Sequence, residues 1–327
     1  MKDVTIVIPN YNGERFLAQC LDSIRPEKQK SEVSYRILVV DNGSRDESAD
    51  ILRARADWVD AIYLEENCGF CKAVNLGIGE SDTPYVLLLN NDTRAFPGFV
   101  QALYDTISKR EKCFSVSASM RMWDDPDRLD DAGDLYCALG WSRARGKGEN
   151  AAKYARTARV FSSCAGAAIY RRSVFAEIGT FDEDHFMYLE DLDICYRALI
   201  HGYYSLYEPR ARVLHYGSAS TGSRYNEKKV LFSAANNIYV IYKNMPVLQI
   251  LLNLPLLLAG FGIKTVFFLK KGLGSAYLKG LAGGFRKSLK ASRLGKGKKV
   301  PFRAGNLPAY LWIQALLWAN CFRISLK

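Results

Sequence analysis

The sequence predicts an α/β fold built on a mostly parallel sheet. Three apolar runs have the composition of buried strands: residues 4–9, 35–40 and 85–89. Helix-like segments lie between and after them, at 16–24, 47–56 and 71–77. Strands that alternate with helices in this way are typical of parallel sheets. Each apolar run ends in polar residues, and ligands of such sheets bind outside the carboxyl ends of the strands.

An acidic cluster follows the aromatic and apolar run at 185–189. Glu190, Asp191 and Asp193 fall within four positions, and the residues after them resemble the start of a helix. They would lie in the first helical turn, where the positive end of the helix dipole favours anions. Asp193 and Arg197 have the i,i+4 spacing of an ion pair. Asp191 is then left as a candidate general base, or as a helix cap.

Composition indicates a folded protein with reduced thiols. The chain has 327 residues, of which 49% are hydrophobic and 12% aromatic, and this excludes a disordered protein. We expect no signal peptide, because Met1 leads almost directly into the first strand. The eight cysteines lack the spacing of a disulfide framework. Cys68 and Cys71 have metal-site spacing, but no second pair accompanies them and a structural zinc site needs four ligands.

Charge divides the chain into two parts. The net formal charge is +11, yet residues 1–227 carry 28 basic and 34 acidic side chains. Residues 228–327 carry 17 basic side chains and no acidic ones. This basic part also contains two apolar stretches, 247–269 and 307–318. Apolar stretches flanked by Lys and Arg fit an anionic membrane surface, and without a nucleic-acid-binding motif we expect no nucleic acid partner.

The stretch 247–269 is long enough to span a bilayer. Several residues weaken it as a span: Gln249, Asn253, Pro255, Gly260 and Gly262. If the N-terminal body is cytoplasmic, one crossing would also place the basic segment 279–303 on the outer side of the membrane, whereas basic segments tend to stay on the cytoplasmic side. We therefore expect interfacial or re-entrant helices. The alternatives are a true span, and packing on the N-terminal body or on another subunit, which leaves a homo-oligomer open.

Seven short motifs, in this order, resemble those of the family 2 glycosyltransferases, which have the GT-A fold. They are Pro9-Asn-Tyr-Asn12, Asp41-Asn-Gly-Ser44, Asn67-Cys-Gly-Phe70, Asn90-Asn-Asp92, Gly179-Thr-Phe-Asp182, Glu190-Asp-Leu-Asp193 and His215-Tyr-Gly-Ser218. Bacterial rhamnosyltransferase-like members are the most similar. We expect a GT-A (Rossmann-like) catalytic domain at 1–243, with a nucleotide-binding half at 1–95 and an acceptor half at 96–243. A helical, membrane-associating extension would occupy 244–327.

The resemblance implies a nucleotide-sugar donor, either dTDP-rhamnose or a UDP-sugar. The implied donor-binding residues are Pro9, Asn10, Tyr11, Asn12, Glu14, Asp41, Asn42, Ser44, Asn67, Gly69, Phe70, Lys72, Asn75 and Asn91. Asn42 stands where the family often has a second Asp, so any contact that this side chain makes with the donor comes from a neutral amide and not from a charged carboxylate. The segment 41–44 also fits a helix-capping turn.

Residues 90–92 occupy the position at which the family binds a divalent cation. Asn90 replaces the first Asp of the family motif, so the resemblance implies Asp92 as the carboxylate ligand of Mg²⁺ or Mn²⁺. His215 is the implied second ligand or a phosphate contact, and manganese tolerates imidazole better than magnesium does. A histidine after a strand can equally be structural. The metal would act as a Lewis acid toward the leaving diphosphate.

In this interpretation Asp191 takes the proton from an acceptor hydroxyl, while Glu190 and Asp193 orient or contact the acceptor. The resemblance implies an inverting enzyme at the cytoplasmic side of the plasma membrane. It would act, as a peripheral or monotopic protein, on a lipid-linked or cell-surface glycan precursor. The alternatives are an enzyme of the same fold that glycosylates a polyprenyl phosphate, and a non-catalytic membrane scaffold.

Three segments between these motifs carry weaker expectations. Residues 121–141 would form part of the acceptor wall. Residues 140–159 have the composition of a mobile basic loop, or of a lid over the diphosphate. Residues 164–170 form a strand of small residues that leaves room for the sugar.

Overall fold

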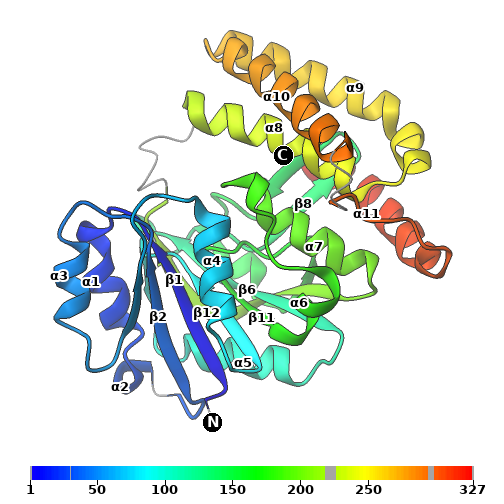
Figure 1. Cartoon of the computed structure of the whole chain (residues 1–327). Coiled ribbons are helices and arrows are strands. Elements are labelled where there is room, and N and C mark those ends of the chain that lie inside the picture. Colours follow the sequence, from blue (N-terminus) through cyan, green and yellow to red (C-terminus); the bar gives the residue numbers. More distant parts are fainter. Residues whose placement is uncertain (1, 30, 218–225, 294–297, 326–327) are drawn as a thin grey trace.

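The computed structural model describes residues 2–29, 31–217, 226–293 and 298–325, and a twisted sheet lies at its centre (Figure 1). One half of the sheet is parallel, with the strand order β4 (Tyr85–Leu89), β1 (Val4–Asn10), β2 (Tyr35–Asp41) and β3 (Asp60–Tyr63). The three predicted strands are confirmed to within one residue. The predicted α/β fold with a mostly parallel sheet is therefore confirmed.

The other half of the sheet mixes strand directions. It continues from β4 with β11 (Ala167–Arg171), β6 (Cys113–Met122), β12 (Tyr204–His215) and β10 (Ala158–Val160). β11 is antiparallel to both of its neighbours, whereas β6 and β12 are parallel. Two short strands attach at its rim: β5 (Thr93–Ala95) pairs with β12, and β7 (Leu129–Asp131) pairs with β6.

Side chains alternate between the two faces of the sheet along each strand. Because both faces carry apolar side chains, helices cover both of them. Ile6 and Ile8 of β1 face a core that includes Leu17, Leu52 and Phe99. The helices of that face are α1 (Glu14–Ser23), α3 (Ser48–Arg53) and α5 (Phe99–Ser108), with the short α2 (Pro26–Gln29) beside them. The other face, which includes Val7, packs against α4 (Phe70–Gly79), α6 (Arg172–Ile178) and α7 (Glu190–Ile200).

The segment expected to be a mobile basic loop is instead folded, so that prediction was wrong. It contains β9 (Trp141–Ala144), which pairs with β8 (Asp134–Cys137), and the 3₁₀ helix η1 (Ala151–Tyr154). Its basic side chains find partners nearby: Arg145 donates to the Ala132 carbonyl and Lys147 to Asp130. Such partners hold the segment to the body, and basic composition alone did not reveal them.

Four long helices form the C-terminal part of the structure: α8 (Glu227–Asn244), α9 (Val247–Lys270), α10 (Gly274–Arg293) and α11 (Leu307–Ser325). Figure 1 shows α8, α9 and α10 stacked over the end of the body at which the strands of the parallel half finish. α10 approaches α8 closely at Gly284, where an added Cβ would lie 2.4 Å from the Ala235 carbonyl oxygen. Two short 3₁₀ helices, η2 (Glu183–His185) and η3 (Ala304–Asn306), precede α7 and α11.

Three of the residues that weaken α9 as a membrane span, Gln249, Asn253 and Gly260, lie on its buried inner face, whereas Pro255 and Gly262 are exposed. Asn253 exchanges two hydrogen bonds of 2.8 Å with Gln314 of α11. Gln249 accepts a hydrogen bond from the Tyr196 hydroxyl, and the Gly260 carbonyl accepts one from the Trp141 indole. α9 therefore packs along the body on one side. Among the described residues it is the helix long and apolar enough to cross a bilayer.

A buried ion cluster joins the body to these helices. Asp193 is fully buried and pairs with Arg197 at 2.9 Å, as the i,i+4 spacing predicts. Lys243 of α8 donates to both Asp193 and Asp182 at 2.8 Å, and Asn244 donates to the second oxygen of Asp193. These partners outweigh the effect of burial and hold the pKa of Asp193 far below its usual value. The domain boundary at residue 243 stays a prediction, but it would cut through this cluster.

We predict that Lys243→Met lowers the free energy of unfolding by about 3–5 kcal/mol, because two buried carboxylates lose their shared partner. Urea unfolding measures the change. Lys228→Met, at an exposed position of the same helix, is the matched control and should stay within about 0.5 kcal/mol of wild type. Equal stability of the two variants would contradict a structural role for the ion cluster.

Candidate functional site

The carboxyl ends of β1 and β2 carry one connected set of predicted donor residues. Asn10 and Asp41 are register partners, and the Asn10 amide donates to the Asp41 carboxylate at 2.9 Å. The backbone N–H of Ser44 donates to the other oxygen of Asp41, and the Ser44 hydroxyl accepts from the N–H of Asn12. The turn at 41–44 is therefore closed by its own side chains. It does not cap α3, which begins only at Ser48.

A second set closes the loop between β3 and α4. The Asn42 side-chain amide donates to Oδ1 of Asn67, and the same Oδ1 accepts from the backbone N–H of Gly69. Gly69 has φ +87°, and an added Cβ would lie 2.5 Å from the ring of Phe186. The predicted donor loop thus packs directly against the segment that leads into the acidic cluster.

The remaining predicted donor residues differ in their surroundings. Asn91 joins the first set by donating to Asn10 at 2.7 Å. Tyr11 and Lys72 are exposed, while Pro9 and Phe70 are half-buried. The Glu14 carboxylate accepts from the backbone of Glu47. Asn75 contacts a different segment, because its amide exchanges two hydrogen bonds with the backbone of Phe181.

The structure brings Asp92 and His215 together from distant parts of the chain. His215 ends β12, and its Nε2 lies 3.4 Å from an Asp92 oxygen. Its Nδ1 lies 2.7 Å from Asp130, which in turn accepts from Lys147. Burial lowers the pKa of His215, but its hydrogen bonds to Asp130 and Asp92 outweigh burial and raise the pKa to about 9.

These side chains fit a divalent cation only in part. A carboxylate and an imidazole are suitable ligands for Mn²⁺. Within the described residues, however, no group of three His, Cys, Asp or Glu side chains is arranged to hold a metal ion. A cation between Asp92 and His215 would therefore need further oxygens, which a diphosphate supplies.

Asp191 lies at the start of α7, directly after a strained turn. Phe186, Tyr188 and Leu189 all have φ between +60° and +70°, which non-glycine residues rarely adopt and which costs roughly 1–3 kcal/mol each. Asn236 of α8 holds this turn by donating to the carbonyls of His185, Met187 and Tyr188, each at 2.9 Å. Such strain is typical of functional sites.

The Asp191 carboxylate accepts backbone hydrogen bonds from Leu192 at 2.7 Å and from Ala165 at 3.4 Å. Burial raises its pKa, and these hydrogen bonds oppose the rise. Its neighbour Glu190 is buried and one of its oxygens lacks a hydrogen-bond partner. Burial and the charge of Asp191 raise the pKa of Glu190 to about 8.

Two further carboxyls of this region were missed by the sequence analysis. Asp131 ends β7 and accepts from the Gly133 N–H at 2.6 Å, while Asp134 begins β8. Burial and nearby negative charges, including that of Asp191, raise the pKa of Asp131 to about 7 and that of Asp134 well above its usual value. Both lie in the segment expected to form the acceptor wall. The feature of the sequence that could have drawn attention to them is the Asp-Asp-Ala-Gly-Asp run at 130–134.

Comparison with known proteins settles the family. A family model described as Glycosyl transferase family 2 matches residues 5–179. The chain belongs to this family. Enzymes of family 2 transfer a sugar from a nucleotide-sugar donor, and the match contains the strand ends that carry Asn10, Asp41 and Asp92.

Relatives of this family 2 glycosyltransferase include proteins that act on lipid-linked molecules. It is 30% identical over 252 residues to the N-acetylglucosaminyl-diphospho-decaprenol L-rhamnosyltransferase of Mycobacterium tuberculosis, covering 68% of this chain and 79% of that protein. It is also 32% identical to the undecaprenyl-phosphate 4-deoxy-4-formamido-L-arabinose transferase of Proteus mirabilis, but over only 33% of this chain and 37% of that protein.

Two solved structures share the GT-A fold of this family 2 glycosyltransferase. One is GalNAc-T7 with UDP, GalNAc and Mn²⁺, at a TM-score of 0.58 and 16% identity, covering 74% of this chain and 48% of that chain. The other is a mannosyltransferase from Pyrobaculum calidifontis with GDP-Man and Mn²⁺, at a TM-score of 0.55 and 14% identity, covering 96% and 84%. At these identities the likeness shows the fold alone.

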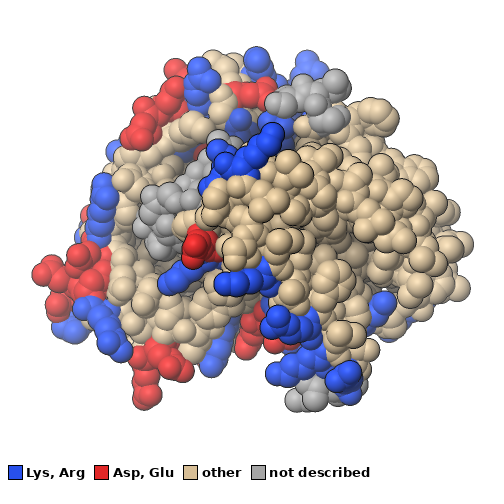
Figure 2. Space-filling model, turned by 90° about the horizontal axis from the view of Figure 1, so that it is seen from above, with Lys and Arg blue, Asp and Glu red and all other residues tan. Residues whose placement is uncertain are grey.

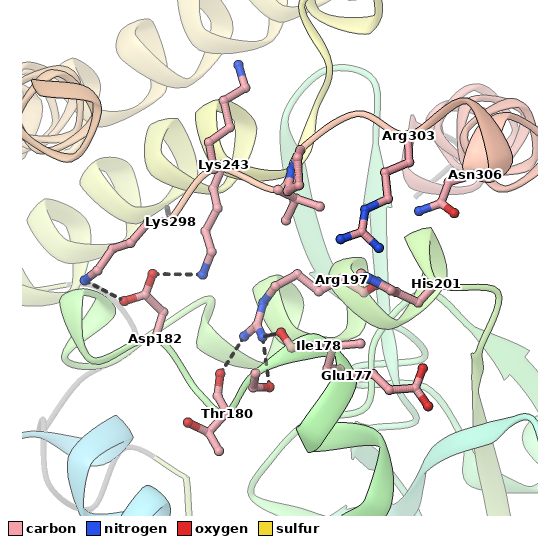
Figure 3. A pocket seen from close by; sticks show the side chains of 14 residues that line it. Glu177, Ile178, Thr180, Asp182, Arg197, His201, Lys243, Lys298, Arg303 and Asn306 are labelled. Carbon is pink, nitrogen blue, oxygen red and sulfur yellow. Dashed lines mark hydrogen bonds and ion pairs between the residues drawn. The ribbon is translucent and has the colours of Figure 1, made fainter. Parts of the chain in front are cut away.

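A pocket of about 330 Å³ lies away from these residues, at the junction with the C-terminal helices (Figure 3). Lys243, Lys298 and Arg303 contribute to its wall together with the buried carboxylate of Asp182. Lys243 and Lys298 both pair with Asp182. No residue predicted to bind donor or metal lines this pocket, so it is part of the ion cluster rather than of the donor site.

The pKa of Glu190 predicts a pH dependence of stability. A carboxyl with a pKa raised from its ordinary value to about 8 keeps its proton in the folded state at pH values where the unfolded chain releases it. Its contribution to stability is therefore fully present below about pH 4.5 and is lost as the pH rises through about 8. Glu190→Gln cannot ionise, so the variant should gain stability relative to wild type between pH 5 and pH 9.

Urea unfolding across this pH range tests the prediction. Glu65→Gln, at an exposed position, should follow the wild-type curve. If Glu190→Gln also follows the wild-type curve, the Glu190 carboxyl is ionised in the folded protein and the prediction is wrong.

Proposed function

We propose that this chain is an inverting, metal-dependent glycosyltransferase that transfers a sugar from dTDP-rhamnose or a UDP-sugar to a hydroxyl of a lipid-linked or cell-surface glycan precursor. The observation that carries the proposal is the position of Asp191. It is a half-buried carboxylate at a helix start, held behind a strained turn that packs on the donor loop. A base in this place can meet an acceptor hydroxyl beside the donor.

The donor would bind along the strand ends, with its base near Asn10 and Asp41. Asp92 and His215 would hold the divalent cation, whose Lewis acidity would stabilise the leaving nucleotide diphosphate. The two solved structures that share the fold contain Mn²⁺, which supports a metal of this kind here. The sequence departs from the family motif at Asn90, so the site would depend on Asp92 as its carboxylate.

Asp191 would accept the proton of the acceptor hydroxyl while that oxygen forms a bond to the anomeric carbon. The bond from this carbon to the diphosphate breaks on the opposite side of the sugar, which inverts the anomeric configuration. The hydrogen bonds from Leu192 and Ala165 orient the Asp191 carboxylate for this step. Glu190, with a raised pKa, would remain protonated near pH 7 and could donate a hydrogen bond to the acceptor.

A lipid-linked acceptor is favoured by the rhamnosyltransferase relative, because that alignment covers most of both proteins. The alternative acceptor, a polyprenyl phosphate, is supported by a relative that matches a third of this chain. The ordered turn before Asp191 and the proximity of Asp92 to His215 argue against a non-catalytic scaffold.

We further propose that the C-terminal helices hold the enzyme on the cytoplasmic side of an anionic membrane. The outer face of α9 exposes a row of leucines, including Leu248, Leu251 and Leu258. Figure 2, seen from above, shows a broad uncharged surface with Lys and Arg at its margins. Because the polar residues of α9 face the body, the helix would lie in the membrane interface rather than span it.

Asp191→Asn should reduce sugar transfer by about 100-fold or more, the usual scale for removal of a general base. Donor binding, measured by calorimetry, should change little because the substitution preserves size. Asp124→Asn, at an exposed position, is the matched control. Transfer within a few-fold of wild type would assign the base to another carboxyl, and retention of the anomeric configuration in the product, read by NMR, would exclude a single displacement.

Replacing Leu248, Leu251 and Leu258 together by Gln should weaken binding to anionic vesicles by at least about 100-fold, because a buried leucine contributes about 1.5–3 kcal/mol. These side chains are 79%, 59% and 65% exposed, so the fold should tolerate the change. Vesicle flotation measures binding, and Tyr63→Gln, which removes an exposed aromatic ring from β3, is the control.

High salt should only partly release the wild-type protein, since the apolar contribution to binding is insensitive to salt. If the triple variant binds vesicles as wild type does, the outer face of α9 is not the membrane contact. If wild type ignores anionic vesicles altogether, the membrane proposal fails.

A further inference from the structure

We propose that Asp130 is a positioning residue for His215, which it holds with Nε2 directed at Asp92 and at the cation that these two residues would share. The inference rests on the proposed metal site and adds to it a residue from a separate element. Asp130 lies on β7, outside the motifs that resemble the family.

The geometry at His215 assigns different roles to its two ring nitrogens. Nδ1 lies 2.7 Å from the Asp130 carboxylate, whereas Nε2 lies 3.4 Å from Asp92. An ionised carboxylate only accepts hydrogen bonds, so Nδ1 carries the hydrogen of this contact. In the neutral imidazole the lone pair is then on Nε2, on the side of Asp92. A carboxylate behind the imidazole in this way fixes both the tautomer and the orientation of a metal-binding histidine.

Asp130 is itself held in place by the chain around it. Lys147 donates to its second oxygen at 2.5 Å, so both oxygens of the carboxylate are occupied. The strand that carries Asp130 is clamped from both sides: β6 pairs with it, and the turn around Lys147 exchanges backbone hydrogen bonds with Leu129. Lys147 thus connects to Asp92 through Asp130 and His215. With its oxygens engaged, Asp130 is placed to orient His215 and not to bind the cation directly.

A purely structural role for the Asp130–His215 contact gives a different expectation. A structural pair would change stability when broken but would leave the choice of metal unaltered. A positioned imidazole instead favours Mn²⁺ over Mg²⁺, because magnesium prefers oxygen ligands. The preference between the two metals therefore separates the two roles.

The experiment measures the affinity of the full chain for Mn²⁺ in the presence of UDP, from the EPR signal of free Mn²⁺, and for Mg²⁺ by competition. Asp130→Ala should weaken Mn²⁺ binding by about 10–100-fold, the usual effect of losing the partner behind a metal-binding histidine. Mg²⁺ binding should change less, so the preference for Mn²⁺ should fall. Asp130→Asn keeps an oxygen that can accept from Nδ1 and should lie between wild type and Asp130→Ala.

Two further variants complete the design. Asp125→Ala removes an exposed carboxylate that pairs with Arg128 in the turn before β7, and it should leave both affinities unchanged. His215→Ala should lower the preference for Mn²⁺ at least as far as Asp130→Ala does. Asp130→Asn has nearly the shape of the native side chain, so it keeps the test decisive if Asp130→Ala does not fold.

The outcomes distinguish this inference from the proposed function. If wild type binds Mn²⁺ and His215→Ala weakens it, but both Asp130 variants keep the affinity and preference of wild type, the positioning role is overturned and the metal site stands. If wild type binds no Mn²⁺, the metal site is wrong and the role of Asp130 falls with it. A parallel fall in preference for the Asp130 and His215 variants supports the inference.

Discussion

The arrangement of the whole molecule depends on neutralising one buried carboxylate. Asp193 has no access to solvent, and a buried charge is tolerated only with charged and hydrogen-bonding partners. Those partners are Arg197 on its own helix and Lys243 and Asn244 at the end of α8. Because Asp191 lies half a turn earlier on the same helix, the ion pairs that fix Asp193 also fix the candidate base. They place α8 as well, and with it the helices that follow.

The parts of the fold that depend on local patterns could be predicted from the sequence. The strands β1, β2 and β4 are short apolar runs that end in polar residues, and a strand of this kind is visible without its partners. The segment 140–159 was misjudged because its order comes from partners such as Asp130 and the Ala132 carbonyl. The polar residues of α9 were correctly identified from the sequence as unfavourable for a membrane span. Their partner, Gln314, lies 61 residues away from Asn253, and no local pattern reveals a contact over that separation.

In the candidate site, too, local patterns predicted some residues, whereas the surroundings of others depend on contacts with distant parts of the chain. Asp92, His215 and Asp191 belong to recognisable motifs. The structure places Asp92 beside His215, with 3.4 Å between a carboxylate oxygen of Asp92 and Nε2 of His215. Asn75 matches a motif position as well, yet its amide is used by the backbone of Phe181, 106 residues along the chain. Asp131 and Asp134 escaped notice because their raised pKa values come from burial and from neighbouring carboxyls, which exist only in the folded chain.

A short series of contacts links the C-terminal helices to the turn before Asp191. Lys287 of α10 donates to the Asn236 side chain of α8 at 2.8 Å, and Asn236 in turn holds three carbonyls of that turn. In the proposed enzyme these helices rest on the bilayer, so the base would stand a fixed distance from the surface that carries a lipid-linked acceptor. A buried amide that satisfies three carbonyls also offsets the strain of the turn. The same side chain would therefore help to shape the site and to set its height above the membrane.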